Sequence, residues 1–206
     1  MKNITMLIAL LCVTAAFAAA VHVDFGNWDR DCWLPVKEAA FPEIGKMVQC
    51  DGHIENYIPV SASEKDVLGC KAGTALMLLK DFCEDDFVAR AELAFEGKGA
   101  PGILLRVQRE GTTTGLMYSL ILYKDGVNLW RYDGKKWSKV GFAKFPVEAG
   151  KFHSLQVHAR GNTFVVHVDA VRVLSVTETE SLPAGEVGLW LGEGICRAQS
   201  FSVRPR

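Results

Sequence analysis

The sequence predicts an all-β fold in which two antiparallel sheets pack face to face as a β-sandwich. From residue 87 to residue 203 the chain is a series of short segments in which apolar and polar residues alternate. Turn residues separate these segments, for example at Lys124-Asp-Gly126, Gly161-Asn162 and Pro183-Ala-Gly185. A strand with one face on a core and the other outward requires this alternation, so the pattern is typical of packed antiparallel sheets.

The first 20 residues are predicted to be a secretory signal peptide. Met1-Lys2-Asn3 precede an apolar stretch that ends in small residues fitting an A-x-A cleavage pattern. An uncleaved membrane anchor is the alternative, although the stretch falls just short of the ~20 residues that a membrane helix needs. Residues 21–206 then have the usual size of one domain, here a single β-sandwich in a secreted or periplasmic protein without a membrane span after signal removal.

Charge and cysteine content narrow the function classes. The net charge is −1 and neither Lys nor Arg forms a run, so nucleic acid is not an expected partner. Five cysteines follow the signal segment, and an exported protein is expected to pair four of them as two disulfide bonds. Short gaps favour local bridges in the N-terminal third, but the sequence leaves the pairing open. These cysteines are Cys32, Cys50, Cys70, Cys83 and Cys196.

The strands are expected in the following order. Residues 21–25 form an opening strand, and the chain is then irregular to about residue 81 because Pro35, Pro42 and Pro59 interrupt it. Further strands are expected over residues 87–95, 103–108, 117–124, 127–133, 137–145, 153–160, 163–169, 171–177, 186–191 and 198–203.

The hairpin at Gly161-Asn162 has a register that the sequence fixes. A two-residue loop pairs Arg160 with Thr163 and places six apolar residues on one face, and this agreement supports the hairpin. On its other face His158 and His167 lie diagonally, close enough to share a metal, but a third ligand is not evident and surface histidines are the alternative. The six apolar residues form the pairs Leu155 and Val168, Val157 and Val166, and Ala159 and Phe164.

A set of strand and turn strings between about Trp28 and the C-terminus matches a known pattern. These strings are Gly102-Ile-Leu-Leu-Arg106, Leu129-Trp130, Gly134-Lys-Lys-Trp137, Leu155-Gln-Val157, Gly161-Asn162, Val166-His-Val-Asp169, Leu182-Pro-Ala-Gly185, Gly188-Leu-Trp190 and Phe201-Ser-Val203. Together they resemble the concanavalin A-like lectin/glucanase jelly roll, and in particular the bacterial 3-keto-disaccharide hydrolase family. The resemblance implies that the opening strand pairs beside residues 199–203, and that a glycoside hydrolase acting on (3-keto-)disaccharides is one expected function.

The residues that a hydrolase of this kind would use are only partly present. Hydrolytic family members typically carry Glu and Asp on the strand that here reads Tyr118-Ser-Leu-Ile-Leu-Tyr123. Glucanases of this fold present Glu, Asp and Glu at alternate strand positions, and the nearest counterpart is Glu92 and Glu96 around Ala94. Regular strand geometry separates these two glutamates by roughly 13 Å, which exceeds the ~5–9.5 Å of catalytic pairs, so a solvated strand face is the ordinary interpretation.

No cofactor is expected apart from a weakly supported calcium ion at the acidic turn Glu84-Asp85-Asp86. Carboxylate oxygens suit calcium, but this turn lacks the spaced ligands of a calcium loop, and a solvated turn is the alternative.

Sugar binding has the better support from the residues. Pyranose rings stack on exposed aromatic rings, and their hydroxyls bond to Arg, Gln and Asn side chains. The alternation on the strands 103–108, 117–124 and 127–133 predicts a groove of outward-facing side chains, with packing of the aromatics under loops as the alternative. The sequence thus favours an exported carbohydrate-binding domain, then a glycoside hydrolase, then a structural or protein-interaction module. The predicted groove residues are Arg106, Gln108, Tyr123, Trp130 and Tyr132, with Trp137 and Trp190 expected in the core or at the rim.

Overall fold

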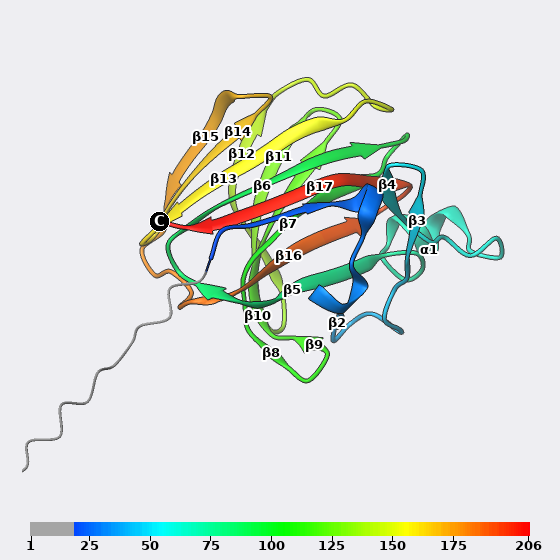
Figure 1. The fold of residues 1–206 in the computed structure, drawn as a ribbon, viewed down its shortest axis with the longest axis horizontal. Helices are drawn as coiled ribbons and strands as arrows, with labels where there is room; N and C mark the ends of the chain where they lie inside the picture. Colours follow the sequence, from blue (N-terminus) through cyan, green and yellow to red (C-terminus); the bar gives the residue numbers. More distant parts are fainter. Residues whose placement is uncertain (1–18) are drawn as a thin grey trace, which may run out of the picture.

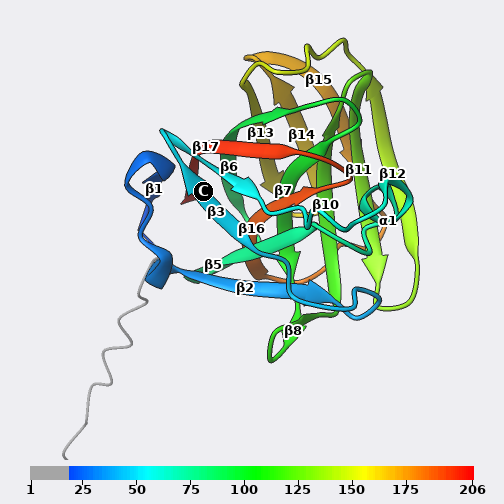
Figure 2. The ribbon, with the colours of Figure 1, turned by 90° about the vertical axis from the view of Figure 1, so that its right-hand side faces the viewer.

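The computed structural model describes residues 19–206, in which two β-sheets pack face to face (Figures 1 and 2). The predicted signal peptide lies outside these residues except for Ala19 and Ala20. None of the helices within residues 19–206 is long and apolar enough to span a membrane. The two-sheet antiparallel architecture predicted from the alternating strands is confirmed.

Within the described residues the first sheet has eight strands in the order β15-β14-β13-β6-β17-β4-β3, with β1 paired to β17. Val21 lies opposite Val203 and Asp24 opposite Ser200, so the predicted pairing of the opening and closing strands is confirmed (Figure 1, blue beside red). The strands are β1 (Val21–Asp24), β3 (Met47–Cys50), β4 (His53–Asn56), β6 (Phe87–Phe95), β13 (His153–Arg160), β14 (Thr163–Val168), β15 (Val171–Thr177) and β17 (Cys196–Pro205).

The second sheet, in the same part of the chain, has nine strands in the order β12-β11-β10-β7-β16-β5-β2-β9-β8. Its pairings are antiparallel except for the short parallel contact in which Lys37 of β2 faces Thr113 of β9. The strands are β2 (Trp33–Glu38), β5 (Ala75–Glu84), β7 (Ala100–Val107), β8 (Arg109–Glu110), β9 (Thr113–Thr114), β10 (Leu116–Tyr123), β11 (Gly126–Asp133), β12 (Trp137–Lys144) and β16 (Gly185–Gly192).

Short helical segments lie in the N-terminal third. The turns η1 (Phe25–Asn27) and η2 (Arg30–Cys32) connect β1 to β2. The helix α1 (Glu64–Leu68) begins after Ser63, whose side chain accepts a hydrogen bond from the Asp66 amide and so caps the first turn.

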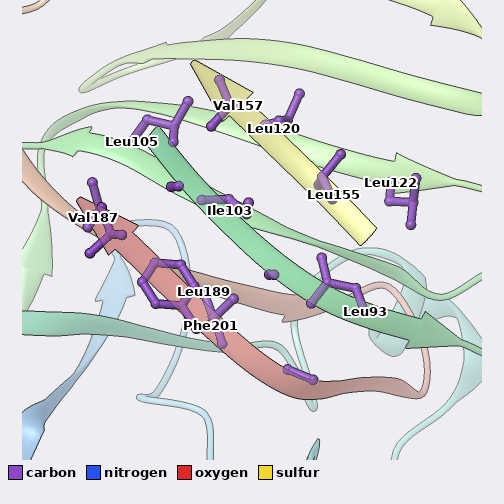
Figure 3. Packing of buried hydrophobic residues seen from close by; sticks show 14 of the residues in the cluster. Leu93, Ile103, Leu105, Leu120, Leu122, Leu155, Val157, Val187, Leu189 and Phe201 are labelled. Atoms are coloured by element: carbon purple, nitrogen blue, oxygen red, sulfur yellow. The ribbon is translucent and has the colours of Figure 1, made fainter. Parts of the chain in front are cut away.

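The main core lies between the two sheets. Leu93, Leu155 and Phe201 of the first sheet point toward Ile103 and Leu120 of the second (Figure 3), and all five side chains are fully buried. Burial of each such side chain stabilises the fold by roughly 1.5–3 kcal/mol. This layer is the inward-facing set that the alternation predicts.

The β13–β14 hairpin has the predicted register throughout. Arg160 lies opposite Thr163, and each of the three predicted apolar pairs is present. The strands expected after residue 86 are also present, with ends that differ by one to a few residues from the predicted ends.

The prediction that residues before 81 are largely irregular was wrong for β5. Leu76 and Leu78 face one way and Met77 and Leu79 the other, and both sets are buried. A strand buried on both faces shows a continuous apolar run, so it lacks the alternation that identifies a half-exposed strand.

The prediction of two disulfide bonds was also wrong for this structure. All five cysteines of residues 19–206 are free. Cys196 is buried, and its thiol donates to the Gly192 carbonyl at 3.1 Å. Cys32, in η2, and Cys83, in β5, are exposed. Core burial rather than cross-linking holds this sandwich together.

Candidate functional site

The outer face of the nine-stranded sheet carries a second apolar cluster. Leu104 of β7, Ile121 of β10 and Trp190 of β16 are buried there, on the side opposite the main core. Phe41, from the segment after β2, packs edge-on against Trp190 at 5.7 Å between ring centroids. The connecting segments therefore cover part of a sheet face that would otherwise be open to solvent.

A pocket of about 420 Å³ opens over this face, and we call it the aromatic pocket. Leu68, the last residue of α1, is one of the residues that line it. Its volume falls within the ~300–1,000 Å³ typical of small-molecule sites. The lining residues are Glu38, Ala40, Phe41, Leu68, Gly69, Cys70, Ser119, Ile121, Tyr123, Trp130, Trp137, Trp190 and Glu193.

Strand pairing places the aromatic side chains in a row. Tyr132 of β11 faces Trp137 of β12, with ring centroids 5.0 Å apart, and Trp137 meets Trp190 edge-on at 6.1 Å. Trp130 lies two residues before Tyr132 and opposite Ser119 of β10. Residues two apart on a strand share a face, so Trp130 and Tyr132 point the same way. Trp130, Trp137 and Trp190 line one side of the pocket.

Two carboxylates lie among these rings. Glu38, the last residue of β2, is 4% exposed, and the Trp137 indole nitrogen donates to its Oε2 at 3.1 Å. Glu193 follows β16, and the Tyr123 hydroxyl lies beside it. Burial raises the pKa of both carboxyl groups, which the neighbouring donors only partly offset.

Neither carboxylate has a cationic partner within the described part of the chain. The ion pairs between side chains of residues 19–206 involve other glutamates and aspartates. Among residues 19–206 the side chains that donate to these two carboxylates are neutral: Trp137 and Tyr132 beside Glu38, and Tyr123 beside Glu193. Buried charges are ordinarily paired or neutralised, so this arrangement is typical of a functional site.

Two further polar atoms in the pocket wall lack partners. Ser119 is 1% exposed and Trp190 is 5% exposed, and neither the Ser119 hydroxyl nor the Trp190 indole nitrogen has a hydrogen-bond partner among the described residues. Buried polar groups are rarely left unsatisfied. Neighbouring atoms cover both of these atoms, so a bound polar molecule would supply the missing bonds after the side chains turn toward it.

Cys70 also lines the pocket, in a backbone conformation with φ of 56° that non-glycine residues rarely adopt. Burial raises the pKa of its thiol to about 11. The thiol is therefore neutral at physiological pH, which argues against a nucleophilic cysteine in this pocket.

Two of the five predicted groove residues, Tyr123 and Trp130, line the aromatic pocket. Tyr132 belongs to the same row but is only 3% exposed beneath Trp137, with its hydroxyl close to Glu38. Tyr132 does face away from the main core, as predicted, but the Trp137 ring covers it, so it does not present an exposed platform.

Gln108 lies outside the pocket. Its side-chain amide donates to the Ala184 carbonyl at 2.8 Å, and it lines a separate shallow hollow with Arg109 and Glu186. The structure therefore does not bring Gln108 together with Tyr123 and Trp130.

Arg106 was expected to face outward, and that expectation was wrong. Three residues of β7 span the interval that two residues of β16 span, and Arg106 has a φ of 49° at this β-bulge. A bulge adds one residue and reverses the alternation, so Val107 joins the outer cluster and Arg106 turns inward.

Arg106 is 1% exposed, and the N–H groups of its guanidinium all donate to acceptors of the protein. It donates to the carbonyls of Asp85, Leu182 and Gly161 and to the Ser181 hydroxyl. Arg106 thus ties together three connections at one end of the sandwich. Burial lowers its pKa, but an arginine remains charged.

The acidic turn proposed for calcium is part of this same network. The Asp85 carbonyl accepts from Arg106, and the Asp86 carboxylate accepts from the Gly161 amide at 2.6 Å. These oxygens are therefore occupied by donors of the protein itself.

The other candidate groups lie on the outer face of the eight-stranded sheet. Glu92 pairs with Arg90 and Glu96 with Arg197, as the solvated-face interpretation implies. The rings of His158 and His167 lie 5.2 Å apart, and within residues 19–206 no group of three metal-binding side chains surrounds them.

Sequence reasoning missed Glu38, Ser119 and Glu193. One local signal was present for Glu193, which lies between two glycines directly after the strand that contains Trp190. Such a string indicates a constrained turn, and Glu193 has a φ of 58°. Nothing in the local sequence distinguishes Glu38, whose burial arises from segments distant in the chain. Trp137 and Trp190 were expected in the core or at the rim, and they form part of the pocket wall.

The comparisons with known proteins identify the fold. No protein-family model matches the chain, and no curated protein matches it either. The β-glucanase of Bacillus licheniformis superposes with a TM-score of 0.68 at 8% identity, covering 92% of this chain and 99% of the glucanase. The carbohydrate-binding module CBM66 of Bacillus subtilis superposes with a TM-score of 0.64 at 16% identity, covering 82% and 92%.

A Bacillus subtilis protein of unknown function with a galectin-like fold gives a TM-score of 0.67 at 10% identity, covering 92% of this chain and 97% of that one. The fold is therefore the concanavalin A-like jelly roll of lectins and glucanases, as the sequence resemblance implied. The narrower resemblance to 3-keto-disaccharide hydrolases is not confirmed by these comparisons.

Proposed function

We propose that the aromatic pocket binds a small saccharide. The observation that carries this proposal is the combination, in one pocket, of an aromatic wall with buried polar atoms that lack partners. An aromatic ring offers a flat apolar surface to the apolar face of a sugar. The Ser119 hydroxyl and the Trp190 indole nitrogen would then bond to sugar hydroxyls that the protein leaves unmatched.

The fold comparisons support the same proposal. One structural neighbour is a carbohydrate-binding module and another is a β-glucanase. Each differs from this chain at more than four residues in five, so the support concerns the fold, and the pocket itself carries the argument.

A glycan array probed with the protein lacking residues 1–20 tests the proposal, followed by titration calorimetry with the best saccharide. Replacing Ser119 or Trp190 is expected to weaken binding, since both supply unmatched donors or acceptors in the pocket wall. Phe152→Ala is the matched control, because Phe152 is an exposed aromatic residue that packs near His53 on the other sheet. Absence of binding to any saccharide would overturn the proposal.

Glycoside hydrolysis is the second candidate function, and one observation favours it. Glu38 and Glu193 are two carboxyl groups with raised pKa in one pocket, a pattern found where one acid donates a proton to a leaving group. However, the pocket-lining positions of β10 are Ser119, Ile121 and Tyr123, where hydrolytic relatives were expected to carry acids. We therefore rank binding first.

The hydrolase proposal has a direct test. Release of reducing sugar from a disaccharide panel, lost in both Glu38→Gln and Glu193→Gln, would establish hydrolysis. Binding without any release by the unaltered protein would exclude it for the sugars tested.

Export to the periplasm or the medium, and organisation as one domain over residues 21–206, remain proposals that depend on the predicted signal peptide. Sequencing the N-terminus of the protein recovered from its native host tests both. A protein that begins at Met1 would contradict export.

A further inference from the structure

The aromatic pocket has an excess of negative charge that the protein does not balance. Glu38 and Glu193 both line this pocket, together with Cys70. Neither belongs to an ion pair within residues 19–206. A neutral sugar would donate hydrogen bonds to these carboxylates but would leave their charge unmatched.

Two lysines near the pocket make contacts with other groups. Lys37 is the chain neighbour of Glu38, yet its ammonium donates to the carbonyls of Phe41 and Pro42 at 3.2 and 3.4 Å. The Lys139 ammonium lies 5.0 Å from the ring centroid of Trp130 and forms no ion pair with a described residue. Neither Lys37 nor Lys139 forms an ion pair with Glu38 or Glu193.

The aromatic rings favour the same kind of ligand. A cation over the face of a tryptophan is attracted by the ring, most strongly when water is excluded. The position of Lys139 over Trp130 is an instance within this protein. A ligand that combines a cation with an apolar ring face would therefore match both the carboxylates and the rings.

We infer that the aromatic pocket selects a saccharide that carries a free, positively charged amino group. This inference rests on the proposed saccharide binding and specifies its ligand class. The ammonium group pairs with Glu38 and Glu193, the sugar ring packs on the aromatic wall, and uncharged hydroxyls bond to Ser119 and Trp190. An N-acetylated sugar lacks the charge and leaves both carboxylates unpaired.

Titration calorimetry with three disaccharides tests the inference: a glucosamine disaccharide with free amines, its N-acetylated form and cellobiose. We expect the free-amine disaccharide to bind at least about tenfold more tightly than the other two, which corresponds to ~1.4 kcal/mol. Glu193→Gln and Glu38→Gln are each expected to reduce strongly the ratio of affinities for the free-amine and N-acetylated disaccharides, and this ratio is the quantity compared between variants. Glu186→Gln is the control, because Glu186 lies on the same sheet, outside the pocket, and pairs with Arg109.

The outcomes separate the inference from the function on which it rests. Equal affinity for all three disaccharides would overturn the inference and leave saccharide binding intact. Failure of every saccharide to bind would overturn the proposed function itself. Methylammonium chloride serves as a further probe, and affinity equal to that of the amino sugar would contradict the inference, because the site would then recognise a cation without its sugar.

Discussion

Two regions of this molecule each bury an ionisable side chain, but they differ in how far the protein satisfies its hydrogen bonds. At one end of the sandwich, Arg106 is 1% exposed and donates to three backbone carbonyls and the Ser181 hydroxyl. In the aromatic pocket, Glu38 is 4% exposed and its carboxylate has only neutral donors around it. Burial imposes a desolvation cost on the charged form of both groups. Only the arginine makes as many hydrogen bonds as it has N–H donors.

The difference separates a structural group from a functional one. A buried ion whose every donor is satisfied by the chain contributes to the fold and has nothing left for a ligand. A buried carboxylate near unsatisfied wall atoms is destabilising by itself, and such residues are retained where a ligand uses them. Whether the protein itself satisfies a buried ionisable group therefore indicates the role of that group better than its residue type does.

The largest effect that this comparison predicts is on stability. Arg106→Ala leaves the carbonyls of Asp85, Leu182 and Gly161 without their donor, and each buried unsatisfied group costs about 1–3 kcal/mol. We expect a loss of at least ~3 kcal/mol, or roughly 6–12 °C in Tm for a chain of this size. Thermal unfolding followed by circular dichroism measures it.

Two variants sharpen this result. Arg106→Lys keeps the charge but not the planar fork, so it should recover only part of the stability. Arg160→Ala, at an exposed position beside the same turn, should leave Tm nearly unchanged. A near-native Tm for Arg106→Ala, or weakened saccharide binding in a folded protein, would contradict this structural role and indicate that Arg106 contributes to ligand binding.

The next effect is on binding. Trp130 is half-buried in the pocket wall, and Trp130→Ala is expected to weaken saccharide binding by about 1–3 kcal/mol, or roughly 5- to 150-fold. Stability should change little, since truncating a fully buried aromatic residue costs ~3–5 kcal/mol and Trp130 is not fully buried. Calorimetry and thermal melts on the same sample compare the two quantities.

Tyr132→Ala is the informative partner of that variant. Tyr132 is buried under Trp137 and close to Glu38, so its truncation should lower stability as well as affinity. If Trp130→Ala instead bound normally and melted far lower, Trp130 would be a core residue and the pocket would lose its main exposed ring.

The contrast between the two regions also explains how far the sequence could predict the structure. Hairpin register and the paired terminal strands follow from local turn chemistry and alternation, and both were predicted. Alternation fails at β5, where both faces are buried, and at Arg106, where a bulge reverses the pattern. Trp130 and Tyr123 were found because they lie on regular strands.

The pocket carboxylates could not be predicted in the same way. Glu38 ends one strand and Glu193 follows another, 155 residues later in the printed numbering, and only the folded sheet brings them to one pocket. Their burial depends on the segment that carries Phe41 and on the end of α1. Properties that arise from such distant contacts have no local pattern in the sequence.

The smallest expected effect is the pH dependence of stability at Glu38. Burial raises the pKa of this carboxyl above its ordinary value of 4.5. As pH rises past 4.5, the unfolded chain releases the proton first, so stability falls until the folded-state pKa is passed and then stays level. The neutral forms of Tyr132 and Cys70, the titratable groups beside Glu38, persist through this window because their own pKa values are raised.

Glu38→Gln removes that titration and keeps an oxygen that can accept from Trp137. We expect the variant to be as stable as the native protein near pH 4 and more stable near pH 7, measured as the urea midpoint at both pH values. Glu193 has the same sign of shift and is more exposed, so Glu193→Gln should give a smaller gain. A Glu38→Gln protein that is equally destabilised at both pH values would show instead that the carboxylate is a structural acceptor, and the contrast with Arg106 would disappear.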